Sequence, residues 1–154
     1  MGTTGTVQSG SYLLEIEKFF PEIKISQEAC PIWVSLVEDN KYDSPEADFF
    51  VKNHIDNLLQ KDKKIDTILL ACTHYPLLLN KIKLATPSSI SIISQGEIVA
   101  KSLKEYLINH PEITANCSKN GVQYFYTTGD AEKFNKHGSI FFGQEIEAKK
   151  LVLS

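Results

Sequence analysis

Long apolar runs are missing from this sequence. Within its 154 residues no run approaches the roughly 18 apolar residues that a membrane-spanning helix needs. The first ten residues, MGTTGTVQSG, lack the basic flank and the apolar segment of a signal peptide. Surplus positive charge is missing too, since the formal net charge is −3. We therefore expect a cytoplasmic protein that binds neither a membrane nor nucleic acid.

Cysteine is also scarce. The three cysteines are odd in number and irregularly spaced, which argues against a disulfide framework. Free thiols in a reducing compartment are the alternative, and one of them is a candidate for chemistry. A metal site is not expected, because the single pair Cys72-x-His74 lacks the paired ligand spacing of zinc sites.

The composition supports a folded core of one ordinary domain or two small lobes. Hydrophobic residues make up 42% of the chain and charged residues 23%, which is ordinary for a globular protein. Patterns typical of helices and of strands alternate along the chain, without an internal repeat. Such alternation predicts an α/β architecture with a mainly parallel sheet flanked by helices.

Helices are predicted where apolar residues recur at helical spacing. The predicted ranges are 12–20, 45–60 with Ser44 as the cap, 76–84, 96–110, and 131–134 with Asp130 as the cap. In the helix over 96–110 the apolar residues are expected to face inward; they are Ile98, Val99, Leu103 and Leu107.

Strands are predicted at short runs rich in apolar and β-branched residues. The predicted ranges are 22–26, 30–38, 65–71, 89–94 and 123–128. The run IDTILLA, residues 65–71, is almost continuously apolar, which is typical of a parallel strand covered on both faces. Residues 109–122 are polar and rich in turn formers, so we expect an exposed, irregular segment there.

Cys72 follows the predicted strand 65–71 directly. In open parallel sheets, ligands bind outside the carboxyl ends of the strands. The amides of a following helix, or a cationic His74, would favour the thiolate, which is the reactive form. Thr73 offers a hydroxyl and an amide to a carboxylate, and His74 could exchange protons with the thiol or a substrate. The residues alone leave open the alternative that Cys72 is a buried, small hydrophobe.

Several segments resemble one family. ACTHYPLL, residues 71–78, is similar to the C-terminal signature of glutamate racemases. GTTGTVQSGSY, ACPIWVSLVE, GEIVAKSL, FYTTGD and IFFG also match in order and spacing, over nearly the whole chain. Ala71 stands where many members have glycine, and SQGE replaces the usual Asp-Ser turn. By this resemblance the chain is identified as a member of the cofactor-independent aspartate/glutamate racemase family.

The resemblance implies a reaction and a set of roles. Members interconvert L- and D-glutamate with two cysteines that face each other across the substrate, without pyridoxal phosphate or another cofactor. Thiols suit this task because a modest change of environment balances thiol and thiolate near neutral pH. At the matching positions, Cys72 is the second of these thiols, His74 assists it, and Glu38 orients or polarises His74.

The resemblance also places three threonines at the substrate. Thr73 matches a residue that holds substrate carboxylate, and Thr3 and Thr6 match two threonines that lie at the substrate. The residues alone would assign Thr3 and Thr6 to turn formation and helix capping. Cys30 is expected to serve packing at the start of a strand, and Cys117 is expected to be incidental.

The family's two-lobed fold implies how the chain is organised. Residues 1–92 would form a complete second lobe that carries Cys72. Residues 93–154 would belong to the first lobe, whose N-terminal half, with the first catalytic cysteine, is absent from the sequence. This chain alone is therefore expected not to racemise glutamate, and to expose apolar surface over residues 93–154. The family also implies a role in supplying D-glutamate for peptidoglycan, and a homodimer for the full-length form.

Three alternatives stay open. The chain could act on another acidic amino acid, such as aspartate, with the same two-thiol layout. It could be a thiol hydrolase in which Cys72 attacks an acyl carbon with His74 as the base. It could also be a non-catalytic binding lobe, because the first half of the family's sequence is absent.

Overall fold

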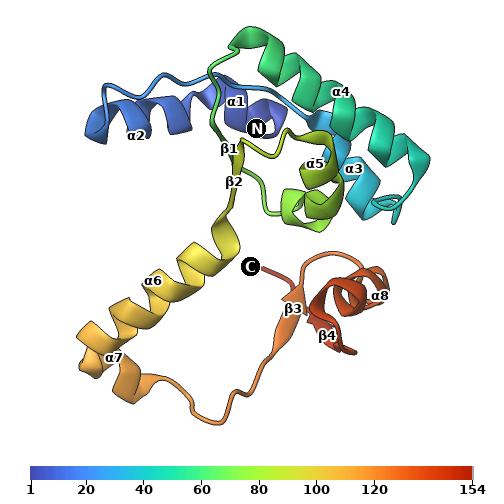
Figure 1. Ribbon diagram of the computed structural model, residues 1–154. Helices are drawn as coiled ribbons and strands as arrows, with labels where there is room; N and C mark the ends of the chain where they lie inside the picture. The colour runs from blue at the N-terminus through green and yellow to red at the C-terminus, as the bar shows by residue number, and fades with distance from the viewer. Residues whose placement is uncertain (154) are drawn as a thin grey trace. The chain divides into compact units, whose positions relative to one another are not determined.

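The computed structural model describes residues 1–153 and is a mixed α/β structure with short parallel strands (Figure 1). It divides into two compact units, Met1–Val99 and Ala100–Ser154. The elements of the first are α1 (Thr4–Ser9), α2 (Ser11–Phe19), α3 (Pro31–Glu38), α4 (Pro45–Lys61), β1 (Thr67–Leu70), the 3-10 helix η1 (Tyr75–Leu78), α5 (Leu79–Ala85) and β2 (Ser91–Ser94). The helix α6 (Gln95–Asn109) begins in the first unit and ends in the second. The second also holds α7 (Pro111–Asn116), β3 (Phe125–Thr127), α8 (Ala131–Phe142) and β4 (Ala148–Lys150).

Parallel strand segments form the centre of the first unit. β1 pairs with β2 in parallel, as the sequence predicts. Gly2 makes parallel bridges to both Ala71 and Ala29. The Ala71 amide donates to the carbonyl of Met1 over 2.8 Å, and the Cys30 amide donates to the carbonyl of Gly2 over 2.8 Å. Four parallel segments therefore lie side by side, in the order Ala29, Gly2, β1 and β2.

The helix α4 begins and packs as its sequence predicts. The Ser44 hydroxyl accepts a hydrogen bond from the Ala47 amide over 3.3 Å, and Pro45 occupies the first helical position, where a missing N–H costs nothing. One face of the helix is buried, through Ala47, Val51, Ile55 and Leu58. This face covers the interior against which α3 and α5 also pack.

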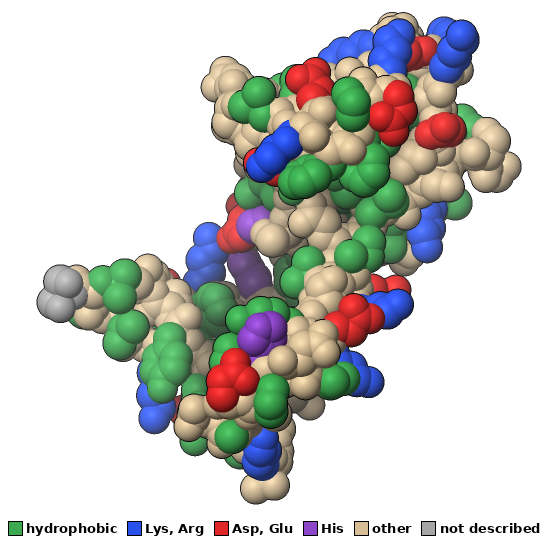
Figure 2. Space-filling model, turned by 90° about the vertical axis from the view of Figure 1, so that its left-hand side faces the viewer, with side chains coloured by type: hydrophobic (Ala, Val, Ile, Leu, Met, Phe, Trp, Pro, Cys, Tyr) green, Lys and Arg blue, Asp and Glu red, His purple; other side chains and the backbone are tan. Residues whose placement is uncertain are grey.

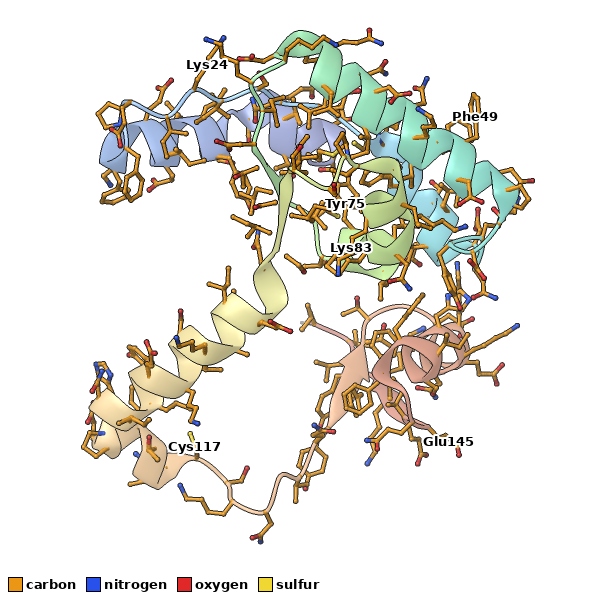
Figure 3. The ribbon with its side chains drawn as sticks, in the orientation of Figure 1. Lys24, Phe49, Tyr75, Lys83, Cys117 and Glu145 are labelled. Atoms are coloured by element: carbon orange, nitrogen blue, oxygen red, sulfur yellow. The ribbon has the colours of Figure 1, made fainter. Side chains whose placement is uncertain are left out.

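Two aromatic side chains occupy the centre of this interior. Trp33 from α3 and Tyr75 from η1 meet edge to face with their ring centroids 4.8 Å apart, and neither ring is exposed. The Tyr75 hydroxyl donates to the carbonyl of Cys30 over 3.0 Å, so its polar end is satisfied inside the core. Figure 3 shows Tyr75 inside this unit, whereas Phe49 points outward from α4.

Two of the predicted strands are wrong. Residues 22–26 have no regular structure, and residues 31–38 form the helix α3. The helix is favoured by Pro31 at its first position and by the spacing of its buried residues, Trp33, Leu36 and Val37. The short apolar run fits a strand and a helix alike, and packing on η1 and α4 selects the helix.

The helix α6 is present as predicted, but the expected burial of its apolar side chains is wrong. Ile98, Val99 and Leu103 are each more than half exposed, and Leu107 is only half-buried. The predicted irregular segment 109–122 is also partly wrong, since it contains α7. Apolar side chains reach the surface elsewhere too, as the green patches of Figure 2 show.

The short parallel pair β3–β4 and the helix α8 form the rest of the second unit. Asp130 caps α8 as predicted, accepting from the Lys133 amide over 3.0 Å, but the helix runs past Phe134 to Phe142. Gly138 gives α8 its close approach to Ile146, because a Cβ at this position would lie 2.4 Å from the Ile146 Cδ1. The division at residues 92 and 93, taken from a two-lobed fold, stays a prediction.

Among residues 1–153, no helix combines the length and the apolar composition that crossing a bilayer demands.

Candidate active site at the carboxyl ends of the parallel strands

The parallel segments of the first unit end on one edge, and the predicted site residues begin there. Thr3 follows Gly2, Cys30 follows Ala29, Cys72 follows Ala71, and Gln95 follows the last residue of β2. Adjacent strands lie about 4.8 Å apart, so residues that leave adjacent ends start as neighbours. The sheet thus brings Thr3 and Cys72 to one edge although 69 positions separate them in sequence, as the numbering shows.

Cys72, His74 and Glu38 form a connected chain of side chains. The Cys72 Sγ lies 4.0 Å from the His74 Nδ1, and the His74 Nε2 lies 2.7 Å from the Glu38 Oε1. A carboxylate can only accept, so the proton of this second contact sits on Nε2. In the neutral imidazole, Nδ1 is then free to accept a proton from the thiol. The order is therefore thiol, base and orienting carboxylate, an arrangement that suits proton transfer at sulfur.

Two different elements bring these groups together. Cys72 and His74 lie in the turn between β1 and η1, whereas Glu38 is the last residue of α3. The contact between α3 and η1, built on Trp33 and Tyr75, therefore sets the separation of His74 and Glu38. The His74 side chain is 31% exposed and that of Glu38 50%, so the pair opens to solvent.

The three predicted threonines lie in two places. Thr73 is exposed, next to Cys72. Thr3 caps α1, accepting from the Thr6 amide over 3.2 Å, and the hydroxyls of Thr3 and Thr6 are 2.9 Å apart. The helix-capping alternative is therefore realised at Thr3. It leaves both hydroxyls half-buried, where one can still donate outward, so a substrate role stays a prediction.

Cys30 and Cys117 differ from Cys72 in their surroundings. Cys30 is fully buried, and burial is the main cause that raises the pKa of its thiol to about 12. A thiol in that state stays protonated and inert near neutral pH. Its packing role agrees with the prediction, but it precedes a helix and not a strand. Cys117 is exposed at the end of α7 (Figure 3).

The structure adds residues that the sequence did not single out. The Gln95 side chain donates to the Tyr12 hydroxyl and to the Leu70 carbonyl at this same edge. The one signal that could have found Gln95 is its place in SQGE, where the chain departs from the family's turn. The described residues contain no group of three or more His, Cys, Asp or Glu side chains that could hold a metal ion.

A parallel α/β unit can present a thiol, an imidazole and a carboxylate, each in contact with the next, at its strand ends. This arrangement is typical of proteins that move protons or acyl groups at sulfur.

Comparison with known proteins narrows this class. No family model matches the chain. It is 33% identical over 147 residues to glutamate racemase 2 of Caldanaerobacter subterraneus subsp. tengcongensis, covering 96% of this chain and 54% of the relative. It is 36% identical over 153 residues to glutamate racemase of Oceanobacillus iheyensis, covering 99% of this chain and 55% of that relative.

The solved structures that match this chain are also glutamate racemases. Glutamate racemase isoform RacE1 from Bacillus anthracis matches with a TM-score of 0.84 and 30% identity, over 99% of this chain and 56% of that one. Glutamate racemase from Francisella tularensis, solved in complex with D-glutamate, matches with a TM-score of 0.82 and 26% identity. This match covers 99% of this chain and 57% of that one. The chain is a homologue of the glutamate racemases along nearly all of its length. It spans about half the length of the curated relatives it matches.

Proposed function

We propose that this chain carries one of the two acid/base thiols of a glutamate racemase, and that Cys72 is this thiol. The arrangement of Cys72, His74 and Glu38 supports the assignment, in a chain whose relatives are glutamate racemases. The Cys72 thiolate takes the α-proton of one glutamate enantiomer, and the thiol returns a proton to the same face in the reverse direction. His74 exchanges a proton with the thiol, and Glu38 holds the imidazole in the orientation that this exchange needs.

The threonines are proposed to bind the substrate. Thr73 and the pair Thr3 and Thr6 flank Cys72 at the strand ends and offer hydroxyls and amides to carboxylates. D-Glutamate in the Francisella tularensis relative supports a small acidic substrate. We further propose the cytoplasm as its location, supply of D-glutamate for peptidoglycan as its role, and a homodimer as the full-length assembly.

Racemisation needs a thiol on each face of the α-carbon, and Cys30 and Cys117 are unsuited to be the second. Cys30 is buried with a raised pKa, and Cys117 is an exposed residue at the end of α7, in a segment that matches none of the family's motifs. We therefore expect no conversion of D- or L-glutamate by the 154-residue chain, followed by circular dichroism.

A chimera tests the proposal directly. The chain replaces the matching part of the Oceanobacillus iheyensis relative, which retains the remainder of its own sequence. The chimera is expected to racemise glutamate, and Cys72→Ser to lower the rate by about 10²–10⁴-fold, the usual contribution of one acid/base group. Cys117→Ser is the matched control and should leave the rate unchanged. A folded chimera without activity, or one indifferent to Cys72→Ser, would contradict the proposal.

A thiol hydrolase is the second candidate, because a Cys–His–Glu series also fits nucleophilic catalysis. The two functions differ in one observable. A hydrolase forms an acyl-enzyme on Cys72 with an activated ester, at a rate that depends on His74. Mass spectrometry of the chain after mixing with such an ester should show no His74-dependent adduct if the racemase assignment is right. Aspartate in place of glutamate in the chimera assay tests the remaining substrate alternative.

A further inference from the structure

Gln95 stands at the junction where β2 ends and α6 begins. Its Nε2 donates to the Tyr12 hydroxyl over 2.7 Å and to the Leu70 carbonyl oxygen over 3.3 Å. A carbonyl oxygen can only accept, so the amide nitrogen must face Leu70, and this fixes the orientation of the side chain. The two bonds join the last residue of β1 to the helix α2.

These two attachment points are close in sequence to the residues of the candidate site. Leu70 is the last residue of β1, two residues before Cys72. Tyr12 belongs to α2, which follows α1 across Gly10 alone, and α1 begins at the Thr3 cap. The Gln95 amide therefore links the strand that precedes the thiol to the helix α2, which follows the threonine-bearing helix α1.

We propose that Gln95 is a positioning residue of the Cys72 site: its amide holds the carboxyl end of β1 against α2, and so sets the place of Cys72 relative to Thr3 and Thr6. The inference rests on the proposed function, in which the thiol and the hydroxyls meet one substrate. The role matters because a misplacement of about 1 Å in such a site can cost roughly 100-fold in rate.

Three variants separate the two hydrogen bonds. Gln95→Glu keeps the size of the side chain and sets a carboxylate oxygen against the Leu70 carbonyl, so the strand bond is lost. The Tyr12 hydroxyl can turn and donate to that carboxylate, so the helix bond survives. Tyr12→Phe does the reverse, and Gln95→Ala removes both bonds. Gln60→Ala, at an exposed glutamine of α4, is the matched control.

Site-resolved amide hydrogen exchange on the 154-residue chain is the test. The reporters are the Ala71 amide, which donates to the Met1 carbonyl, and the Tyr75 amide, which donates to the Cys72 carbonyl. Gln95→Ala is expected to speed exchange at both by about tenfold or more, and to leave Val51 and Ile55 within about twofold. Gln95→Glu should act on Ala71 nearly as strongly, and Gln60→Ala should change nothing. An equal increase throughout the unit, or none at Ala71, would overturn the inference.

Kinetics of the chimera give a second, independent reading. There, Gln95→Glu is expected to lower kcat by about tenfold or more while KM stays within about twofold, since the contacts that bind substrate remain but the thiol is displaced. A loss in KM alone would overturn the positioning role. If the unsubstituted chimera does not racemise glutamate, the proposed function fails, whereas the exchange at Ala71 still decides whether Gln95 holds this strand end.

Discussion

The two units of the chain differ in how they bury apolar surface. All of the largest fully buried side chains belong to Met1–Val99, among them Trp33, Tyr75 and Ile55. Within the described part of Ala100–Ser154, Ile146 and Ala148 are the only buried apolar residues, and each of them is 6% exposed. The first unit therefore has an interior that can hold its strand ends in place. The second leaves large apolar side chains in solvent, such as Ile108 at 67% and Tyr124 at 75% exposure.

The better-buried unit also holds the residues of this chain that form the candidate site. Cys72, His74, Glu38 and the threonine pair all lie within Met1–Val99. The second unit exposes many large apolar side chains, as expected for residues 93–154. The experiments below exploit this contrast, from the largest expected change in stability to the smallest.

Removing a core side chain from the first unit should have the largest effect. Ile55→Ala removes all side-chain carbons beyond Cβ from a fully buried position of α4 and should lower the free energy of unfolding by about 3 kcal/mol. Trp33 is the single tryptophan and lies in the same core, so its fluorescence during a urea titration reports this unit. Ile108→Ala, at an exposed position of α6, should change the free energy of unfolding by less than about 0.5 kcal/mol. Equal losses would erase the contrast between the units.

A buried ionic cluster should contribute next, and with a dependence on pH. The Glu28 Oε1 lies 3.0 Å from the His54 Nδ1, and its Oε2 lies 2.6 Å from the Lys61 Nζ. Burial alone would raise the pKa of Glu28, but the bonds to Lys61 and His54 outweigh it and lower the pKa below its ordinary value.

Because the pKa of Glu28 is lower in the folded chain, its ionised form stabilises the fold at any pH above the pKa of the unfolded chain, near 4.5. This contribution is lost as the pH falls through the lower pKa of the folded chain. Glu28→Gln should therefore cost about 2 kcal/mol at pH 7, a reduced figure because Lys61 is 46% exposed. The loss should shrink as titrations move below about pH 4. A loss that stays constant from pH 7 to pH 3 would rule out the ionic explanation.

A smaller effect is expected in the second unit, at the contact between α8 and the segment before β4. Gly138→Ala places a Cβ 2.4 Å from the Ile146 Cδ1, so the Ile146 side chain, one of the few buried ones there, has to shift. The crowding should exceed the gain in helix propensity and cost about 1 kcal/mol, measured by amide exchange in α8. Ile146→Val removes the Cδ1 and should cancel the loss in the double variant. Additive losses would show that the contact is not the cause.

The smallest effect is expected on the exposed face of α6. Leu103→Gln, at a side chain 55% exposed, should change the free energy of unfolding by less than about 0.5 kcal/mol. It should nevertheless reduce the fluorescence of a bound hydrophobic dye, because it interrupts the apolar surface of the helix. A clear loss of stability would mean that Leu103 is packed, and that the second unit is better ordered than its exposure indicates.

The sequence predicts those elements that depend on local signals. The cap at Ser44, the helix α4 and the parallel pair β1–β2 follow from capping chemistry and apolar periodicity, and all three are confirmed. The helix α3 was mistaken for a strand, because an apolar run of this length suits both and only its contacts with η1 and α4 decide. The burial expected for α6 was wrong because periodicity indicates an apolar face but not what covers it.

The site divides in the same way. Cys72, Thr73 and His74 are consecutive in sequence, and they can be predicted as site residues because reactive and polar side chains directly follow an apolar strand. Glu38 lies 36 positions from His74 and could be proposed only from family resemblance, since no local pattern predicts such a contact. Gln95 was missed for the same reason, because its two partners lie 25 and 83 positions away.

Gly2 has a consequence for how this sequence can vary. It bridges Ala29 and Ala71, the residues before Cys30 and Cys72, and any Cβ placed on it would lie 3.1 Å from the Thr6 Cγ2. A larger residue would push Thr6, whose hydroxyl lies against that of Thr3. A substitution at this one backbone position would therefore disturb two features of the site together. These are the alignment of three strand ends and the spacing of the Thr3 and Thr6 hydroxyls.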